Sequence, residues 1–214
     1  MHDYEVFSYY FCLVINSILL MKMIQRFKNA IQEYHPLSQQ ATAAFVEILK
    51  PEIIQKGAVF LEQGQIPKSY AYIDRGLFSY FHTFENGDVV IKKFFAENSF
   101  VASTSALIQE KPGLFTIKAL EETHILKYQN SDYRVLLKKF PEIAFFHINY
   151  LEKNWVVAKE PLEINLKYES AKIRYWQFQQ EYQNIENRLK QHQIASYLGI
   201  TPTQLSRIRK TVKN

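Results

Sequence analysis

The side chains best suited to chemistry lie near the end of the chain, where polar and basic residues recur at helical spacing. Arginine and glutamine hydrogen-bond the edges of guanine and adenine, whereas basic and hydroxyl groups bind phosphates. Gln204 and Arg207 are therefore the expected readers of base edges. The other members of this predicted nucleic-acid surface are Lys190, Thr201, Thr203, Ser206, Arg209 and Lys210. Its lysines and Arg209 are expected to contact phosphates.

Charge is unevenly distributed along the chain. The net charge of the whole sequence is +5, and residues 1–188 sum to zero because the five basic residues after position 188 account for all of it. No aspartate or glutamate follows Glu186 in the sequence. A basic, acid-free end on an otherwise neutral chain favours binding to a polyanion. A solvated surface helix is the alternative interpretation.

These side chains need a scaffold, and the sequence predicts two short helices joined by a tight turn. Gly199 predicts the end of the first helix, because glycine adopts left-handed backbone angles without a Cβ penalty. Thr201 and Pro202 predict the start of the second helix, as its cap and its first residue. Apolar residues three or four apart predict the buried sides, namely Ile194, Leu198, Leu205, Ile208 and Val212. This pattern is typical of a helix-turn-helix whose second helix reads DNA.

Composition and cysteine content limit the class of protein. With 214 residues, 47% of them hydrophobic, the chain is long enough to bury a sizeable core. Its single cysteine, Cys12, excludes a disulfide or a four-cysteine metal site within one chain. We therefore expect a globular protein of a reducing compartment, the cytoplasm.

The first residues form an apolar stretch. Residues 6–21 are nearly all apolar, but 16 residues fall short of the ~20 that span a bilayer as a helix. We assign residues 1–23 to an apolar N-terminal extension. It is either an over-extended reading frame whose natural start is Met21 or Met23, or an added helix that packs on the domain. A membrane anchor, which would make the chain a membrane-tethered sensor, is the remaining alternative.

The middle of the chain shows a period of two. Between residues 53 and 128, short alternating runs are separated by glycines and by an Asn86-Gly87 hairpin signal. Many short, evenly spaced strands are typical of a barrel or jelly roll. We assign residues 24–132 to this β-roll domain.

The period returns to 3.6 after residue 132. Apolar residues then step by four and three, as along the seam of a coiled coil. This predicted seam consists of Ala144, Ile148, Leu151, Trp155, Ala158 and Leu162. We predict a short helix followed by a dimerisation helix at 133–164, and a helix-turn-helix domain at 165–214. Core packing of the seam within a monomer is the alternative.

The order of these parts resembles the Crp/Fnr superfamily of bacterial transcription regulators. The motifs that carry the resemblance are KGAVF at 56–60, EQG at 62–64, IDRG at 73–76, the stretch 100–128, IASYLGIT at 194–201 and LSRI at 205–208. The resemblance implies an α+β fold with an N-terminal antiparallel, jelly-roll-like β-roll as sensor. A long dimerisation helix and a C-terminal helical domain of the winged-helix or helix-turn-helix type follow.

The resemblance also implies a function. It is that of a cytoplasmic, homodimeric, sequence-specific DNA-binding transcription regulator, and not of an enzyme. The implied partners are double-stranded DNA with a palindromic operator, a second copy of the chain, RNA polymerase and an unidentified small-molecule effector.

The predicted sensor departs from relatives that bind cyclic AMP. In those proteins a glutamate holds the ribose and an arginine neutralises the cyclic phosphate, and here Ser103 and Gly113 occupy the aligned positions. A desolvated phosphate without a cation is unfavourable, so we expect no cyclic AMP binding of the usual kind. Lys111, two positions before Gly113, is the alternative cation for the phosphate, and Ser103, Thr104 and Ser105 offer hydroxyls to some other effector.

A jelly roll also fits a metalloenzyme of the cupin type. That chemistry needs two or three histidines and a carboxylate that converge inside the barrel. The predicted strands contain His82 and His124, without a His-x-His pair. We therefore expect no catalysis, no metal and no cofactor.

Overall fold

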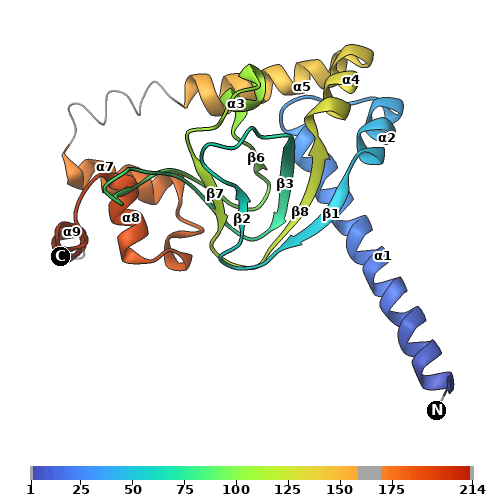
Figure 1. Ribbon diagram of the computed structural model, residues 1–214, viewed down its shortest axis with the longest axis horizontal. Helices are drawn as coiled ribbons and strands as arrows, with labels where there is room; N and C mark the ends of the chain where they lie inside the picture. The colour runs from blue at the N-terminus through green and yellow to red at the C-terminus, as the bar shows by residue number, and fades with distance from the viewer. Residues whose placement is uncertain (1, 159–169, 213–214) are drawn as a thin grey trace.

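The structure is a computed structural model that describes the backbone of residues 2–158 and 170–212 and the side chains of residues 17–158 and 170–211. Three parts follow one another along the chain in Figure 1. They are the N-terminal helix α1 (His2–Gln32), a β-roll with its covering helices, and a group of C-terminal helices. The predicted α+β class is confirmed.

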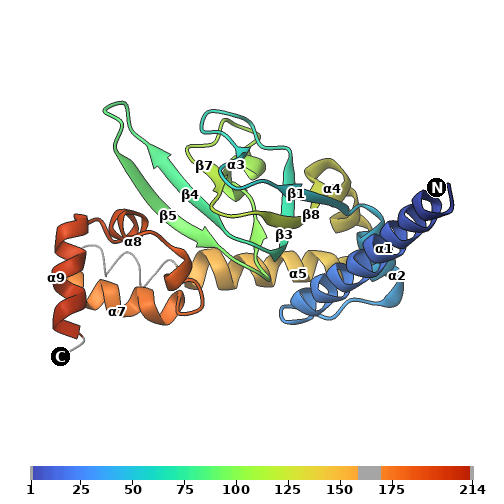
Figure 2. The same ribbon diagram turned by 90° about the horizontal axis from the view of Figure 1, so that it is seen from below.

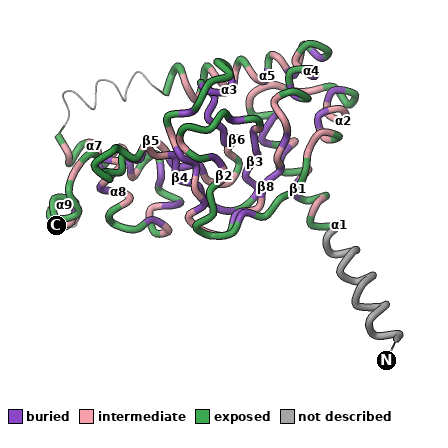
Figure 3. The backbone as a smooth tube through the Cα atoms, viewed as in Figure 1, coloured by how far each residue is buried: buried purple, intermediate pink, exposed green. Residues whose placement is uncertain are grey.

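The β-roll consists of two four-stranded antiparallel sheets, with orders β1-β8-β3-β6 and β2-β7-β4-β5. Its strands are β1 (Lys50–Ile54), β2 (Val59–Leu61), β3 (Ser69–Arg75), β4 (Phe78–Thr83), β5 (Val89–Phe95), β6 (Phe100–Val101), β7 (Thr116–Ala119) and β8 (Thr123–Gln129). The short helix α3 (Thr104–Gln109) connects β6 to β7. Pro51 lies in β1, an edge strand, where its missing N–H costs little. Buried residues concentrate in the strands (Figure 3), and Ile73, Phe78 and Ile117 form part of the core between the sheets.

One close approach in the roll requires glycine. Gly76 follows β3 with φ 118°, and a Cβ at this position would lie 2.6 Å from the Cα of Thr123. The Oγ1 of Thr123 accepts a hydrogen bond from the N–H of Leu77 at 3.2 Å. The IDRG motif therefore ends in a glycine because the chain crosses the start of β8 there.

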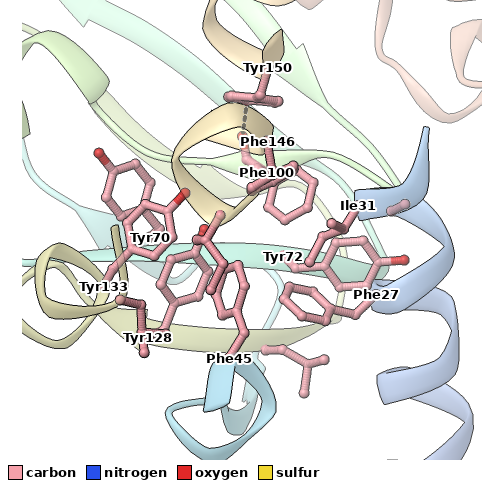
Figure 4. Packing of buried hydrophobic residues seen from close by; sticks show 14 of the residues in the cluster. Phe27, Ile31, Phe45, Tyr70, Tyr72, Phe100, Tyr128, Tyr133, Phe146 and Tyr150 are labelled. Carbon is pink, nitrogen blue, oxygen red and sulfur yellow. Dashed lines mark hydrogen bonds between the residues drawn. The ribbon is translucent and has the colours of Figure 1, made fainter. Parts of the chain in front are cut away.

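Helix α1 is continuous across the predicted boundary at residue 23. Its C-terminal part buries Met23, Phe27 and Ile31 against the outer face of the first sheet. Figure 4 shows Phe27 beside Tyr72, and the two ring centres are 5.5 Å apart. Arg26 donates hydrogen bonds of 2.6 and 2.7 Å to the buried Asp74 carboxylate at the end of β3. This part of α1 is therefore an integral part of the domain.

Among the described residues, no helix is both long and apolar enough to cross a membrane.

Other helices cover the same sheet. They are α2 (Gln39–Glu47), α4 (Asn130–Lys139) and α5 (Pro141–Leu151), which continues as a π-helical segment, η1 (Glu152–Val157). Phe45 from α2, Tyr133 from α4 and Phe146 from α5 meet in one aromatic cluster (Figure 4). The hydroxyl of Tyr150 donates to the Phe100 carbonyl at 2.7 Å and fixes the end of α5 on the roll.

The C-terminal helices lie against the β4–β5 hairpin (Figure 2). They are α7 (Ala171–Glu181), the 3₁₀ turn η2 (Glu186–Arg188), α8 (Gln191–Leu198) and α9 (Pro202–Val212). Phe94 of β5 packs on Phe178, Tyr182 and Tyr197, with ring centres 5.5–6.5 Å apart. Residues 170–212 contain helices and turns, and no strand.

Candidate nucleic-acid interface and sensor site

The turn between α8 and α9 has the predicted geometry. Gly199 caps α8 in the left-handed region with φ 65°. Pro202 is the first residue of α9, as predicted. The Thr201 hydroxyl accepts a hydrogen bond from the Gln204 N–H at 3.2 Å, and the Gln204 side-chain oxygen accepts from the Thr201 N–H at 2.8 Å. Both side chains therefore start helix α9 by reciprocal capping.

Two faces of α9 are clearly distinct. Leu205 is fully buried with Ile194, Ala195 and Leu198 of α8. The exposed residues on the other side of α9 are Thr203, Gln204, Arg207 and Lys210, and Ser206 lies half-buried beside them. The side chain of Val212 lies outside the described residues. The structure thus brings most of the predicted polar surface onto one solvent-facing side.

Arg209 does not belong to this face. Its guanidinium donates to the Glu186 carboxylate at 2.9 Å and to the Tyr175 hydroxyl at 3.1 Å. Residues two apart on a helix do not share a face, so the position of Arg207 already places Arg209 elsewhere. Arg209 therefore holds α9 against α7, and the phosphate contact predicted for it would have to break this ion pair. Lys190 lies exposed at the start of α8.

Polar contacts tie the helix-turn-helix to the β-roll. The Ser196 hydroxyl donates to the Val89 carbonyl at 2.5 Å and accepts from the Ile91 N–H at 3.1 Å. Arg188 donates to Glu97 at 2.9 Å and also to Glu121. Burial by itself raises the pKa of Glu97, but hydrogen bonds from Arg188 and the Gly76 N–H outweigh it, so this pKa lies below its usual value. No periodic signal in the sequence indicated this junction.

A cavity of about 520 Å³ opens in the β-roll. It is lined by Phe60, Leu61, Gln65, Ile66, Pro67, Lys68, Ser69, Ser103 and Ile117. Ser103 is thus the only one of the four predicted effector residues that lines it. Thr104 is buried in α3, whereas Ser105 and Lys111 are exposed.

Backbone hydrogen bonds hold Gly113, the residue that the sequence resemblance aligns with a phosphate-binding arginine. The Gly113 N–H donates to the Gln65 carbonyl at 2.9 Å, and the Gly113 carbonyl accepts from the Gly64 N–H at 2.8 Å. A Cβ at Gly113 would lie 3.2 Å from the Ser103 Oγ. A larger side chain at residue 113 would therefore have to displace Ser103.

The residues of the predicted seam do not all face the same side of the helix. Leu151 and Trp155 pack against the chain's own core, and Ala144 is half-buried. Ile148 and Ala158 are exposed, and Leu162 lies outside the described residues. The exposed apolar side chains form what we call the exposed stripe, consisting of Phe145, Ile148, Val156 and Val157. Ile148 and Leu151 already differ within the regular helix α5, and from residue 152 the wider turns of the π-helical segment shift the heptad spacing further.

The two histidines of the strands do not converge. His82 Nδ1 lies 2.7 Å from the Leu114 carbonyl oxygen in the sheet that contains β4. His124 Nε2 lies 3.1 Å from a Glu122 carboxylate oxygen in the other sheet. The two histidines lie in different sheets and therefore do not form one metal site.

Comparisons with known proteins agree with this geometry. Residues 51–140 match the family model of the cyclic nucleotide-binding domain. A search of curated proteins found no match. FixK2 from Bradyrhizobium japonicum superposes with a TM-score of 0.67 at 13% identity, over 78% of this chain and 85% of FixK2.

Two further solved structures have the same architecture. The c-di-GMP responsive global regulator CLP of Xanthomonas campestris has a TM-score of 0.64 at 10% identity, over 82% of this chain and 92% of CLP. A CooA mutant from Carboxydothermus hydrogenoformans has a TM-score of 0.62 at 16% identity, over 78% of this chain and 77% of CooA. The chain therefore has the fold of these three solved proteins, and its residues 51–140 are similar to the cyclic nucleotide-binding domain.

Proposed function

We propose that this chain is a sequence-specific DNA-binding transcription regulator that acts as a homodimer. The observation that carries the proposal is α9, whose buried Leu205 anchors it on α8 while Arg207 and Lys210 face solvent. Such a helix fits the major groove of DNA, where arginine recognises guanine and lysine neutralises phosphates. By analogy with Crp/Fnr regulators, we also propose RNA polymerase as a partner. The same analogy suggests a cytoplasmic location.

The proposed second copy binds at the exposed stripe. One recognition helix covers only a few base pairs, so useful specificity requires two, about one helical turn of DNA (~34 Å) apart. Phe145 and Ile148 on α5 are 53% and 47% exposed, so about half of each apolar side chain is available to a second copy. Of the described seam residues, the proposed dimer contact keeps Ile148 and Ala158, whereas Leu151 and Trp155 pack on the chain's own core.

We further propose that the sensor does not bind cyclic AMP in the usual manner. Ser103 is buried and engaged with the Tyr80 hydroxyl at 3.1 Å, and Gly113 offers no cation. A cyclic phosphate in this position would lose its hydration without gaining an ion pair.

The roles of Arg207 and Lys210 can be separated by mutation. On the best duplex selected from random DNA, Arg207→Ala is expected to cost ~1–3 kcal/mol and to relax one base position of each half-site. Lys210→Ala is expected to weaken all sequences alike and to lower the salt slope of log K by about 1. Fluorescence anisotropy at several salt concentrations measures both effects.

Lys111→Ala is the matched control, because Lys111 is exposed but lies on the β-roll. It is expected to leave affinity and salt slope unchanged. Equal, sequence-independent losses in Arg207→Ala and Lys210→Ala would show that Arg207 does not read a base.

A further inference from the structure

The cavity of about 520 Å³ in the β-roll combines apolar walls with a few polar groups. Its volume lies in the ~300–1,000 Å³ range of pockets that hold small molecules. Its apolar lining residues are Phe60, Leu61, Ile66, Pro67 and Ile117. Its polar ones are Gln65, Lys68, Ser69 and Ser103, and only Ser103 lies outside residues 65–69. One short segment, which leads from β2 into β3, therefore supplies most of the polar groups.

Lys68 carries the charge of this cavity. Among the lining residues that the structure describes, it is the only charged one, and none is acidic. In the described part of the chain, no carboxylate forms an ion pair with Lys68. Lys127, whose Nζ lies 5.6 Å from the centre of the Phe60 ring, is already balanced by Glu52 at 3.1 Å. The cavity therefore offers one unbalanced positive charge, which favours an anionic ligand.

The backbone that carries Lys68 is held on both sides. The Gln65 carbonyl accepts a hydrogen bond from the Gly113 N–H at 2.9 Å, and the Lys68 carbonyl accepts from the Asn130 N–H at 2.8 Å. Pro67 lies buried between these two anchors, and its ring fixes the backbone angle φ. A ligand therefore has to order only the side chain of Lys68, which lowers the entropic cost of binding.

Two neutral residues of the same segment add hydrogen-bond donors. The side-chain oxygen of Gln65 accepts from the Glu62 N–H at 3.3 Å, which leaves the NH₂ group of Gln65 as a donor. Ser69 is half-buried and adds a hydroxyl. A carboxylate has two oxygens that only accept, so it matches an ammonium group flanked by neutral donors.

A single lysine also limits the charge of the ligand. A carboxylate carries one negative charge, which one ammonium group balances. A phosphate monoester carries about −1.5 to −2 charges at pH 7, so part of its charge would stay unbalanced beside apolar Ile66 and Ile117. The apolar walls likewise disfavour a second charged group elsewhere on the ligand. The lining thus fits one carboxylate on an apolar body.

We propose that this cavity binds a small monocarboxylate with an apolar body, whose carboxylate pairs with Lys68. The cation then comes from the segment before β3, and not from Gly113, which the sequence resemblance aligns with the arginine of cyclic AMP-binding relatives. That this ligand regulates DNA binding rests on the proposed function, whereas its binding does not.

Hexanoate is a suitable probe, and isothermal titration calorimetry on the full chain measures its binding. We expect saturable binding of one molecule per chain at millimolar or lower concentration. The neutral alcohol 1-hexanol has the same apolar tail and is expected to bind at least ~10-fold more weakly, because it cannot form the ion pair. Hexylammonium, which carries the opposite charge, is expected to show no saturable binding.

Four variants identify the cation. Lys68→Gln is expected to weaken hexanoate binding at least ~10-fold, whereas Lys68→Arg is expected to stay within ~3-fold of the parent. Lys68→Glu is expected to bind hexylammonium more tightly than hexanoate, which reverses the preference of the parent. Lys56→Gln is the matched control, because Lys56 is exposed on the same β-roll but does not line the cavity. It is expected to bind hexanoate like the parent.

The absence of saturable hexanoate binding would overturn the proposal. Equal affinities for hexanoate and 1-hexanol would overturn it too, as would equal affinities of Lys68→Gln and its parent when circular dichroism shows both folded. DNA binding is measured separately on duplexes selected from a random pool. Hexanoate binding without DNA binding would refute the proposed function and leave the carboxylate site standing. The reverse result would refute the site alone.

Discussion

Replacing Phe145 and Ile148 together with glutamate is expected to yield a folded monomer that binds its operator at least ~100-fold more weakly. Both side chains are exposed on α5, on the side that faces away from the roll. In a two-fold dimer the new carboxylates would face their own copies, and burying these like charges costs several kcal/mol. Sedimentation velocity measures the loss of the dimer, and anisotropy on the selected duplex measures the loss of affinity.

Val135→Glu is the control for this double variant. Val135 is 61% exposed on α4, outside the exposed stripe, so its replacement is expected to leave mass and affinity unchanged. Circular dichroism checks that the β-roll of each variant is intact. A double variant that remains dimeric would show that the partner surface lies elsewhere on the chain.

Truncation of Phe27 to alanine is expected to lower the free energy of unfolding by ~3–5 kcal/mol. Phe27 is 1% exposed and contacts the rings of Phe45, Tyr72 and Phe100 at 5.0–6.0 Å. Its removal leaves a cavity at the point where α1 meets α2 and the first sheet. Urea unfolding followed by circular dichroism measures the change.

Met21→Ala on the same helix is the matched comparison. Met21 is 61% exposed, so its replacement is expected to change stability by less than ~0.5 kcal/mol. Equal effects of the two substitutions would mean that α1 is an appendage of the folding unit. A large difference would place the second half of α1 inside the folding unit.

Local signals in the sequence predicted the elements that position the DNA-binding face. Gly199, Thr201 and Pro202 each have one strong backbone preference, and the structure shows all three as predicted. The strand 89–95 and the strand 59–61 were likewise predicted from their alternation and from the glycines beside them. Such signals act within a few residues, so they do not depend on tertiary packing.

Features that depend on distant contacts escaped prediction. The π-helical turn at residues 152–157 has no known signal in the sequence, and a regular heptad therefore placed Trp155 on the dimer side. Arg209 was predicted to contact phosphate, because its ion-pair partner Glu186 lies 23 positions earlier in the sequence and only the fold brings the two together. Each of these requires knowledge of which elements pack together.

Selection of bound duplexes from a random pool of double-stranded DNA tests the central claim, specific DNA recognition by a dimer, most directly. We expect the enriched sequences to converge on two half-sites related by two-fold symmetry, with centres about 10 base pairs apart. Each half-site is expected to contain a guanine whose enrichment disappears when the selection is repeated with Arg207→Ala. Enriched sequences without a shared motif, or with a single unrepeated half-site, would contradict the proposed function.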